Sequence, residues 1–249
     1  MQIVRVVPWP VYFVLLLFFG CWSNGALAGG LQISPVSLDI AATTRSGEVW
    51  LRNAGTDIVH AQVRVYRWSQ KDGEDVLTPD NGMIASPPMV QIAPGQQQLV
   101  RLVRIGPMAA AAVGERTYRL VIDELPIKKP NSKIGLDFVF RYSIPVFIAG
   151  TAPPRLQLDW SVQEVGKKVW LRVANTGNSH AQLANLAFTA PNGRSTVVYQ
   201  GLAGYALAGK YRRVELSAPA SLFAGGGTFN SLINGIKTAT KVQPISKTP

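Results

Sequence analysis

Short runs in which apolar and polar residues alternate recur along the chain after residue 30, and this period of two restricts the fold more than any other feature. Such alternation is typical of β-strands, whose successive side chains point to opposite faces of a sheet. Examples are Val36-Leu38-Ile40, Val49-Leu51, Val63-Val65, Val100-Leu102 and Tyr118-Leu120-Ile122. Turn residues separate the runs and no helical spacers lie between them, so the sequence predicts an all-β protein of antiparallel sandwiches.

The strand pattern is interrupted at residues 150–154, which read Gly-Thr-Ala-Pro-Pro. Proline has no amide hydrogen for a sheet ladder, so a continuous central strand is not expected here. The alternating pattern resumes at Leu156. We therefore predict a first domain at residues 31–150 and a second at residues 151–249, each of ordinary domain size.

The two predicted domains share a short internal repeat. The copies are Val49-Trp50-Leu51-Arg52 with Asn53, Gly55 and His60, and Val169-Trp170-Leu171-Arg172 with Asn175, Gly177 and His180. We interpret each copy as a β-hairpin, in which two strands flank an Asn/Gly turn. Both histidines of the protein belong to this repeat, and without cysteines or further ligands beside them we expect strand-end residues rather than a metal site.

The first 28 residues have the parts of an export signal. Arg5 gives a positive start, residues 11–19 are apolar, and Ala26-Leu27-Ala28 matches the pattern before a signal peptidase cleavage site. The apolar stretch is too short to cross a hydrocarbon core of about 30 Å, so no stable membrane insertion is expected after cleavage. Lipidation at Cys21, which follows Gly20, is the alternative.

Removal of this leader leaves a chain that is basic and free of cysteine. The full sequence has 25 Lys and Arg against 14 Asp and Glu, and the loss of Arg5 lowers the net charge to +10 (11 minus 1). An exported protein without disulfides depends on core burial for its stability. The charge favours anionic partners, but no run of five basic residues points to nucleic acid.

The motifs of common active sites are missing from the sequence. It has no Gly-x-Ser-x-Gly elbow, phosphate-binding glycine loop or cluster of zinc ligands. Asp123 and Glu124 are adjacent, so on a strand they would point to opposite faces and could not act as a carboxylate pair. We therefore expect no enzymatic activity, no catalytic residue, no metal and no cofactor.

The segment at residues 135–148 carries the strongest functional signal. On one strand, Leu136, Phe138, Phe140 and Tyr142 would share a face, which we call the apolar row. The row could be ordinary core, or it could be offered to a partner protein that lacks a strand. In the second case, four large side chains would contribute about 6–12 kcal/mol before ordering costs.

Five segments, in order along residues 31–150, resemble the periplasmic pilus chaperones of chaperone–usher pathways. They are LQISPVSLDI, VWLRNAGTD with HAQVRVYRW, IAPGQQQLVRLVR, ERTYRLVIDELP and GLDFVFRYSIPVFIAG. The resemblance implies two Ig-like β-sandwich domains in a boomerang arrangement, located in the periplasm. It also implies that the partners are pilus or fimbrial subunits and an outer-membrane usher, with subunits bound by donor-strand complementation.

The resemblance further implies basic residues in the cleft that hold the terminal carboxylate of a subunit. The first strand of the family offers such a base, but Ser37 stands near that place here, and the YSIPVF segment also lacks one. The likeness is therefore nearer to the archaic-type branch. We take Arg119 and Arg141 as candidate anchors, with Arg116 behind them, because a guanidinium can bond both carboxylate oxygens.

Two other classes of protein remain as alternatives at this stage. A structural or adhesive Ig-like protein of the surface or the pilus would share the strand pattern, and so would a carbohydrate-binding sandwich. Pilus subunits of such systems are single incomplete domains with a strand-like N-terminal extension, whereas two complete domains are predicted here.

Overall fold

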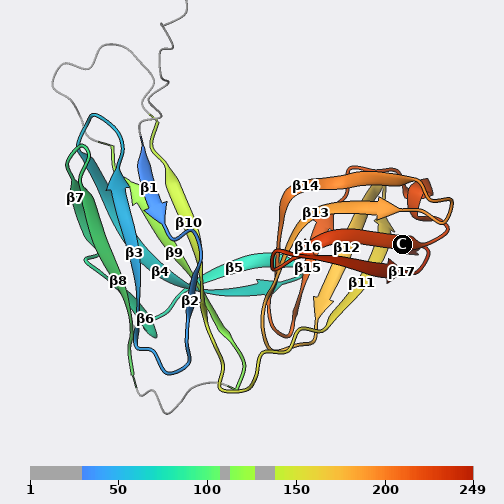
Figure 1. The fold of residues 1–249 in the computed structure, drawn as a ribbon, viewed down its shortest axis with the longest axis horizontal. Helices are drawn as coiled ribbons and strands as arrows, with labels where there is room; N and C mark the ends of the chain where they lie inside the picture. The colour runs from blue at the N-terminus through green and yellow to red at the C-terminus, as the bar shows by residue number, and fades with distance from the viewer. Residues whose placement is uncertain (1–29, 107–112, 127–137, 249) are drawn as a thin grey trace, which may run out of the picture.

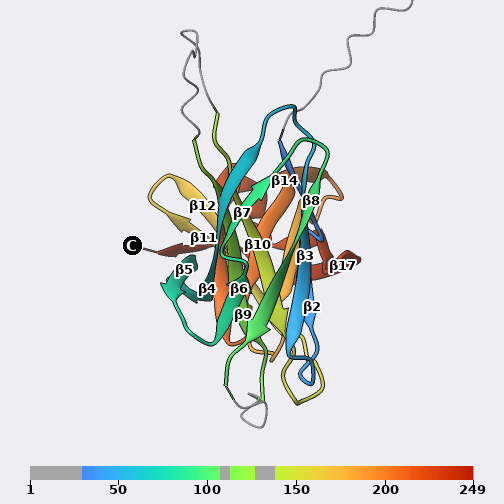
Figure 2. The ribbon, with the colours of Figure 1, turned by 90° about the vertical axis from the view of Figure 1, so that its left-hand side faces the viewer.

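The computed structural model describes residues 30–106, 113–126 and 138–248, and it contains four β-sheets that face one another in pairs. The two pairs form two sandwiches set at an angle (Figure 1), and Figure 2 views the molecule from the side of the first sandwich. Within the described residues the only helical element is a short 3-10 turn, η2 (Ala220–Phe223). The predicted all-β class is confirmed.

The first sandwich consists of a four-stranded sheet, in the order β1-β3-β8-β6, and a six-stranded sheet, in the order β2-β10-β9-β4-β5 with β7 beside β4. The strands are β1 (Leu31–Ser34), β2 (Leu38–Ile40), β3 (Ser46–Asn53), β4 (Val59–Lys71), β5 (Glu74–Pro79), β6 (Met83–Ser86), β7 (Met89–Ile92), β8 (Gln97–Arg104), β9 (Arg116–Glu124) and β10 (Arg141–Ile148). Alternate residues of β3 are buried, as the period of two requires. The inward side chains of both sheets form one core.

The second sandwich consists of two four-stranded sheets, in the orders β15-β12-β11-β18 and β14-β13-β16-β17. The strands are β11 (Leu158–Val165), β12 (Lys168–Asn175), β13 (Ala181–Thr189), β14 (Ser195–Ala206), β15 (Lys210–Glu215), β16 (Gly227–Ile233), β17 (Ile236–Val242) and β18 (Ser246–Thr248). Phe188, Phe223 and Phe229 meet in a core separate from the first. Residues 149–157, between β10 and β11, contain no strand.

The internal repeat is not a hairpin, so that interpretation was wrong. β3 pairs with β1 and β8, whereas β4 pairs with β5, β7 and β9 in the opposite sheet. In the second sandwich β12 and β13 likewise belong to opposite sheets. Each copy is therefore a corner at which the chain crosses from one sheet to the other.

A buried asparagine explains why both corners have the same sequence. The Asn53 amide donates to the carbonyls of Asp57 (2.7 Å) and Ile92 (2.9 Å), and its oxygen accepts from the Gly55 amide at 2.9 Å. Asn175 donates to Ser179 and Ala206 at 2.7 and 2.9 Å and accepts from Gly177 at 2.9 Å. These bonds join the corner to a strand-end carbonyl across the sandwich, so the side chain replaces missing ladder bonds.

The β4–β5 hairpin extends from the first sandwich onto the second (Figure 1). At its tip Gly73 has a φ of 81°, and a Cβ there would lie 2.9 Å from the Cβ of Arg213, so both conformation and space favour glycine. Gln70 donates to the Tyr205 carbonyl at 2.6 Å and accepts from the Leu207 amide at 3.0 Å. Buried hydrogen bonds therefore join β4 to the backbone of the other sandwich.

A small apolar cluster lies between the two sandwiches, apart from both cores. It contains Trp68 and Phe147 from the first sandwich and Tyr205 and Leu207 from the second, all buried. The Trp68 ring centroid lies 5.9 Å from that of Phe147 and 5.3 Å from that of Tyr205. This junction cluster, with the Gln70 bonds, holds the angle between the sandwiches.

Replacing Asn53 or Asn175 with alanine is expected to destabilise the protein by about 2–3 kcal/mol, because buried carbonyl and amide groups lose their partner. The free energy of unfolding in urea measures this loss. Asn192→Ala is the control, because Asn192 accepts one amide bond in an exposed turn, and it should change stability by less than about 0.5 kcal/mol. Equal losses at all three positions would contradict the corner role.

Candidate functional site

Strand β10 has an open edge over part of its length. It pairs with β9 along its full length from Arg141 to Ile148, but β2 covers only Val146–Ile148 on its other side. The chain before β2 has crossed to the opposite sheet, where β1 pairs with β3. Among the described residues, no strand therefore pairs with Arg141–Pro145 on the side away from β9.

The described members of the apolar row, Phe138, Phe140 and Tyr142, lie just before β10 or at its start. Ile144, Val146 and Ile148 lie buried in the first core, and Tyr142 packs against the same core. Toward the N-terminus, Phe140 is 48% and Phe138 72% exposed. The row thus changes from buried to exposed toward its N-terminal end.

Tyr142 lies at the change from buried to exposed. Its ring packs against the first core, and its hydroxyl donates to a Glu124 carboxylate oxygen at 2.9 Å. Burial and this hydrogen bond raise the pKa of Tyr142 to about 12. The Phe140 ring centroid lies 6.3 Å from that of Tyr142, so the two rings are neighbours at the surface.

The strand is shorter than the sequence pattern predicts. β10 begins at Arg141, so Phe138 and Phe140 precede it, and Leu136 lies outside the described residues. The ladder still reaches Phe140, whose carbonyl accepts from the Glu124 amide at 2.9 Å. The next amide of that chain, at Leu125, donates to the carbonyl of His60 and so continues the pairing of β9 with β4, because alternate amides of a central strand point to opposite neighbours.

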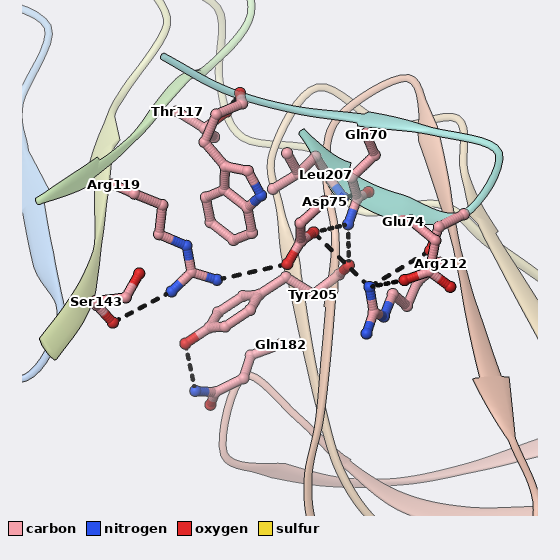
Figure 3. Close-up of polar contacts among 12 residues, drawn as sticks. Gln70, Glu74, Asp75, Thr117, Arg119, Ser143, Gln182, Tyr205, Leu207 and Arg212 are labelled. Carbon is pink, nitrogen blue, oxygen red and sulfur yellow. Dashed lines mark hydrogen bonds and ion pairs between the residues drawn. The ribbon is translucent and has the colours of Figure 1, made fainter. Parts of the chain in front are cut away.

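Arg119 lies in the cleft between the two sandwiches (Figure 3). Its guanidinium stacks 3.8 Å from the Trp68 ring and lies 5.5 Å from the Tyr205 ring. Its polar contacts are long, at 3.9 Å to Asp75 and 3.5 Å to the Ser143 carbonyl. Burial lowers the pKa of Arg119. The side chain is thus a largely desolvated cation with weak partners, suited to a stronger anion.

Arg141 has a different environment. Its side chain is mostly exposed and pairs with the Asp123 carboxylate, which also pairs with Arg64. Burial opposes ionisation of Asp123, but the hydrogen bonds from Arg64 and Arg141 prevail and lower its pKa. Asp123 is therefore part of an ion-paired group on the outer face of the β10-β9-β4 sheet.

The three candidate arginines do not converge on one point. Arg116 and Arg141 lie at opposite ends of the β9–β10 ladder, paired with Ile148 and Asp123 respectively. Arg119 and Arg141 share one face of that sheet, whereas Arg116, three residues from Arg119, faces the other way. Arg119 contacts the second sandwich through the cleft, at the Tyr205 ring.

Sequence reasoning missed the residues that surround Arg119. Asp75 and Glu74 belong to the β4–β5 hairpin, and both lie near the Arg212 guanidinium, at 3.8 and 3.5 Å. The Tyr205 hydroxyl accepts from the Gln182 amide at 3.0 Å. Their charge or polarity gave no local signal, because these contacts join different strands that are distant in the chain.

The two histidines lie apart. His180 contacts Glu115 through Nδ1 at 2.8 Å and stacks on Phe147, with ring centroids 3.4 Å apart, so it joins the two sandwiches.

The described residues contain no group of three or more side chains able to hold a metal ion. Within the same ranges, no helix combines the length and the apolar character needed to cross a membrane.

A family model described as the pili and flagellar-assembly chaperone, PapD N-terminal domain, matches residues 30–154. The match spans half of the sequence, and the chain belongs to this family. The resemblance inferred from the five segments is therefore confirmed, and with it the expectation of an assembly chaperone that is not an enzyme. No curated protein sequence matches the chain.

Solved structures of chaperones share the fold. A chain of the CsuC–CsuE chaperone–tip adhesion subunit pre-assembly complex, from archaic chaperone-usher Csu pili of Acinetobacter baumannii, is 24% identical, with a TM-score of 0.64 over 88% of this chain and 100% of that chain. The E. coli chaperone DraB is 16% identical, with a TM-score of 0.58 over 86% and 95%. A chain of the Salmonella enterica SafA pilin–SafB chaperone complex is 17% identical, with a TM-score of 0.59 over 86% and 95%. These matches confirm the predicted pair of Ig-like sandwiches.

The lowered pKa of Asp123 has a consequence for acid stability. The ionised, paired carboxylate contributes stability that is present above its ordinary pKa of 3.8 and is lost as pH falls through the lower folded value. Asp123→Asn should therefore flatten the fall in unfolding free energy below about pH 4. Urea unfolding across this pH range measures the slope. Asp159→Asn, at an exposed acid of β11, is the control, and a slope unchanged by Asp123→Asn would contradict the ion-pair account.

Proposed function

We propose that this protein is a periplasmic chaperone that binds pilus subunits by donor-strand complementation and delivers them to an outer-membrane usher. The observation that carries the proposal is the apolar row beside the open edge of β10. Phe138 and Phe140, both exposed, directly precede the strand whose alternate residues Ile144, Val146 and Ile148 are buried in the first core. A subunit that lacks one strand could pair with the free backbone and bury these rings.

The cleft supplies the second part of the proposal. Arg119 is desolvated, stacked on Trp68 and only weakly paired with Asp75. A terminal carboxylate of a subunit would form shorter, charge-assisted bonds with this guanidinium. Arg141 is the less suitable anchor, because Asp123 already pairs with it.

The location and the handover rest on the family and on the leader. The predicted signal peptide, residues 1–28, lies outside the described residues, and we propose that it is cleaved after Ala28. Solved complexes of similar fold contain a chaperone with a tip adhesion subunit or with a pilin, which supports subunits as partners here. The usher is proposed as the receiving partner because the CsuC–CsuE complex comes from a chaperone-usher system.

Phe138→Glu with Phe140→Glu should abolish subunit capture, because two rings that contribute about 3–6 kcal/mol on burial are replaced by charges. Co-purification of a pilus subunit from the same genome, co-expressed in the periplasm of a host, measures capture. Val139→Glu is the matched control, since Val139 is 52% exposed between the two rings and is not part of the apolar row. Loss of the native thermal unfolding transition in the double variant alone would show that the row is core and overturn the proposal.

Arg119→Gln should weaken subunit binding by about 1.5–3 kcal/mol, the range for a hydrogen bond to a charged group. Arg141→Gln should have a smaller effect, because its present partner is Asp123. Titration of the purified chaperone with a peptide that matches the C-terminus of the subunit, compared with its amidated form, measures the carboxylate contribution. If Arg119→Gln does not reduce the preference for the free carboxylate, Arg119 is not the anchor.

A further inference from the structure

The positive charge of the protein is concentrated in the second sandwich. Residues 151–249 contain 11 Lys and Arg and 3 Asp and Glu, a net charge of +8 (11 minus 3) out of +10 for the chain without its leader. The apolar row and Arg119 belong to the first sandwich and do not account for this excess of positive charge. On β12 and β15, two of these arginines are stacked against aromatic rings.

Two arginines lie directly opposite each other on the outer face of these strands. Arg172 of β12 is the register partner of Arg213 of β15, while the flanking Leu171 and Val173 are buried in the core. The Arg172 guanidinium lies 4.4 Å from the Tyr211 ring, and that of Arg213 lies 4.4 Å from the Trp170 ring. We call these four residues the basic ladder, in which two cations are stacked against aromatic side chains.

The arginines of the ladder have no acidic partner among the described residues. Glu215, on the same face, pairs with Lys168 at 2.8 Å, and no ion pair joins Asp159 of β11 to Arg172 or Arg213. Like charges placed directly opposite on a sheet repel, and each aromatic stack offsets only part of that cost. The nearby acids of the β4–β5 hairpin pair instead with Arg212.

Two further features define the surroundings of the ladder. The Nε of Arg213 is buried without a hydrogen-bond partner among the described residues, and Gly73 of the hairpin tip lies against Arg213 and Tyr211. Beside Arg172 and Tyr211 lies a groove of about 600 Å³, into which Lys210 adds a third positive charge and Gln70 of the first sandwich forms part of the wall. Both arginines are half-buried, and stacking limits the orientations of each planar guanidinium, a group that can bond both oxygens of one carboxylate.

We propose that the basic ladder, with Lys210, binds an acidic segment of a partner protein. Two adjacent guanidiniums match two closely spaced carboxylates, each able to accept two parallel hydrogen bonds. A membrane surface fits less well, because Trp170 and Tyr211 are half-buried beside the arginines and are not free to insert among lipids. The ladder shares no residue with the apolar row or with Arg119, so it is a second site and not part of the proposed subunit site.

Fluorescence anisotropy with a labelled oligoglutamate peptide at low ionic strength tests the proposal. Arg172→Gln with Arg213→Gln should weaken binding by about tenfold or more, since both bidentate sites are lost. Lys237→Gln with Lys241→Gln removes the same charge from exposed positions on β17 and should change binding by less than about twofold. Equal weakening by the two pairs would show that net charge alone drives binding and would overturn the proposal.

Three further measurements complete the test. Arg172→Lys with Arg213→Lys keeps the charge and loses the planar fork, so weaker peptide binding supports the proposal and unchanged binding overturns it, even if the glutamine pair does not fold. Binding to phosphatidylglycerol vesicles but not to oligoglutamate would assign the face to lipid. Subunit capture by the glutamine pair should be unchanged, and its loss would show that the ladder belongs to the subunit site.

Discussion

The arrangement of the molecule depends on β10, whose two faces and two halves have different partners. Alternate residues from Ile144 to Ile148 enter the first core, while Phe147, on the opposite face, enters the junction cluster with Trp68. The strand therefore fixes the first sandwich and the contact to the second at once. Because β2 covers only its last three residues, the other half keeps an open edge. An edge of this kind favours pairing with another chain, which is the physical basis of the function we propose.

The junction between the sandwiches gives the cleft its chemistry. Gln70 bonds to the backbone of the second sandwich, and Gly73 allows the hairpin tip to approach Arg213. This contact brings Asp75 near Arg119, but at 3.9 Å the pair is loose. A cation that is desolvated yet not fully satisfied is costly to the free protein, and an incoming carboxylate would relieve that cost. The same packing that sets the angle therefore also prepares the cleft.

The hairpin also lies between two groups of arginines for which we propose different partners. On one side Arg119 lies over Trp68, and on the other Arg213 and Tyr211 lie against Gly73. The first group is part of the proposed subunit site, whereas the second lies on the outer face of β12 and β15.

The sequence by itself determined the all-β class, because a period of two specifies extended backbone. The domain boundary near residue 150 and the shared face of the apolar row stay predictions from the same pattern. The sequence did not determine which strands pair. The repeated Asn/Gly segments looked like hairpins, yet Asn53 and Asn175 direct the chain to the opposite sheet through bonds to Ile92 and Ala206. Only the tertiary structure decided that Arg119 meets the second sandwich and that Arg172 faces Arg213, because strand pairing is a choice among distant segments and no local pattern encodes it.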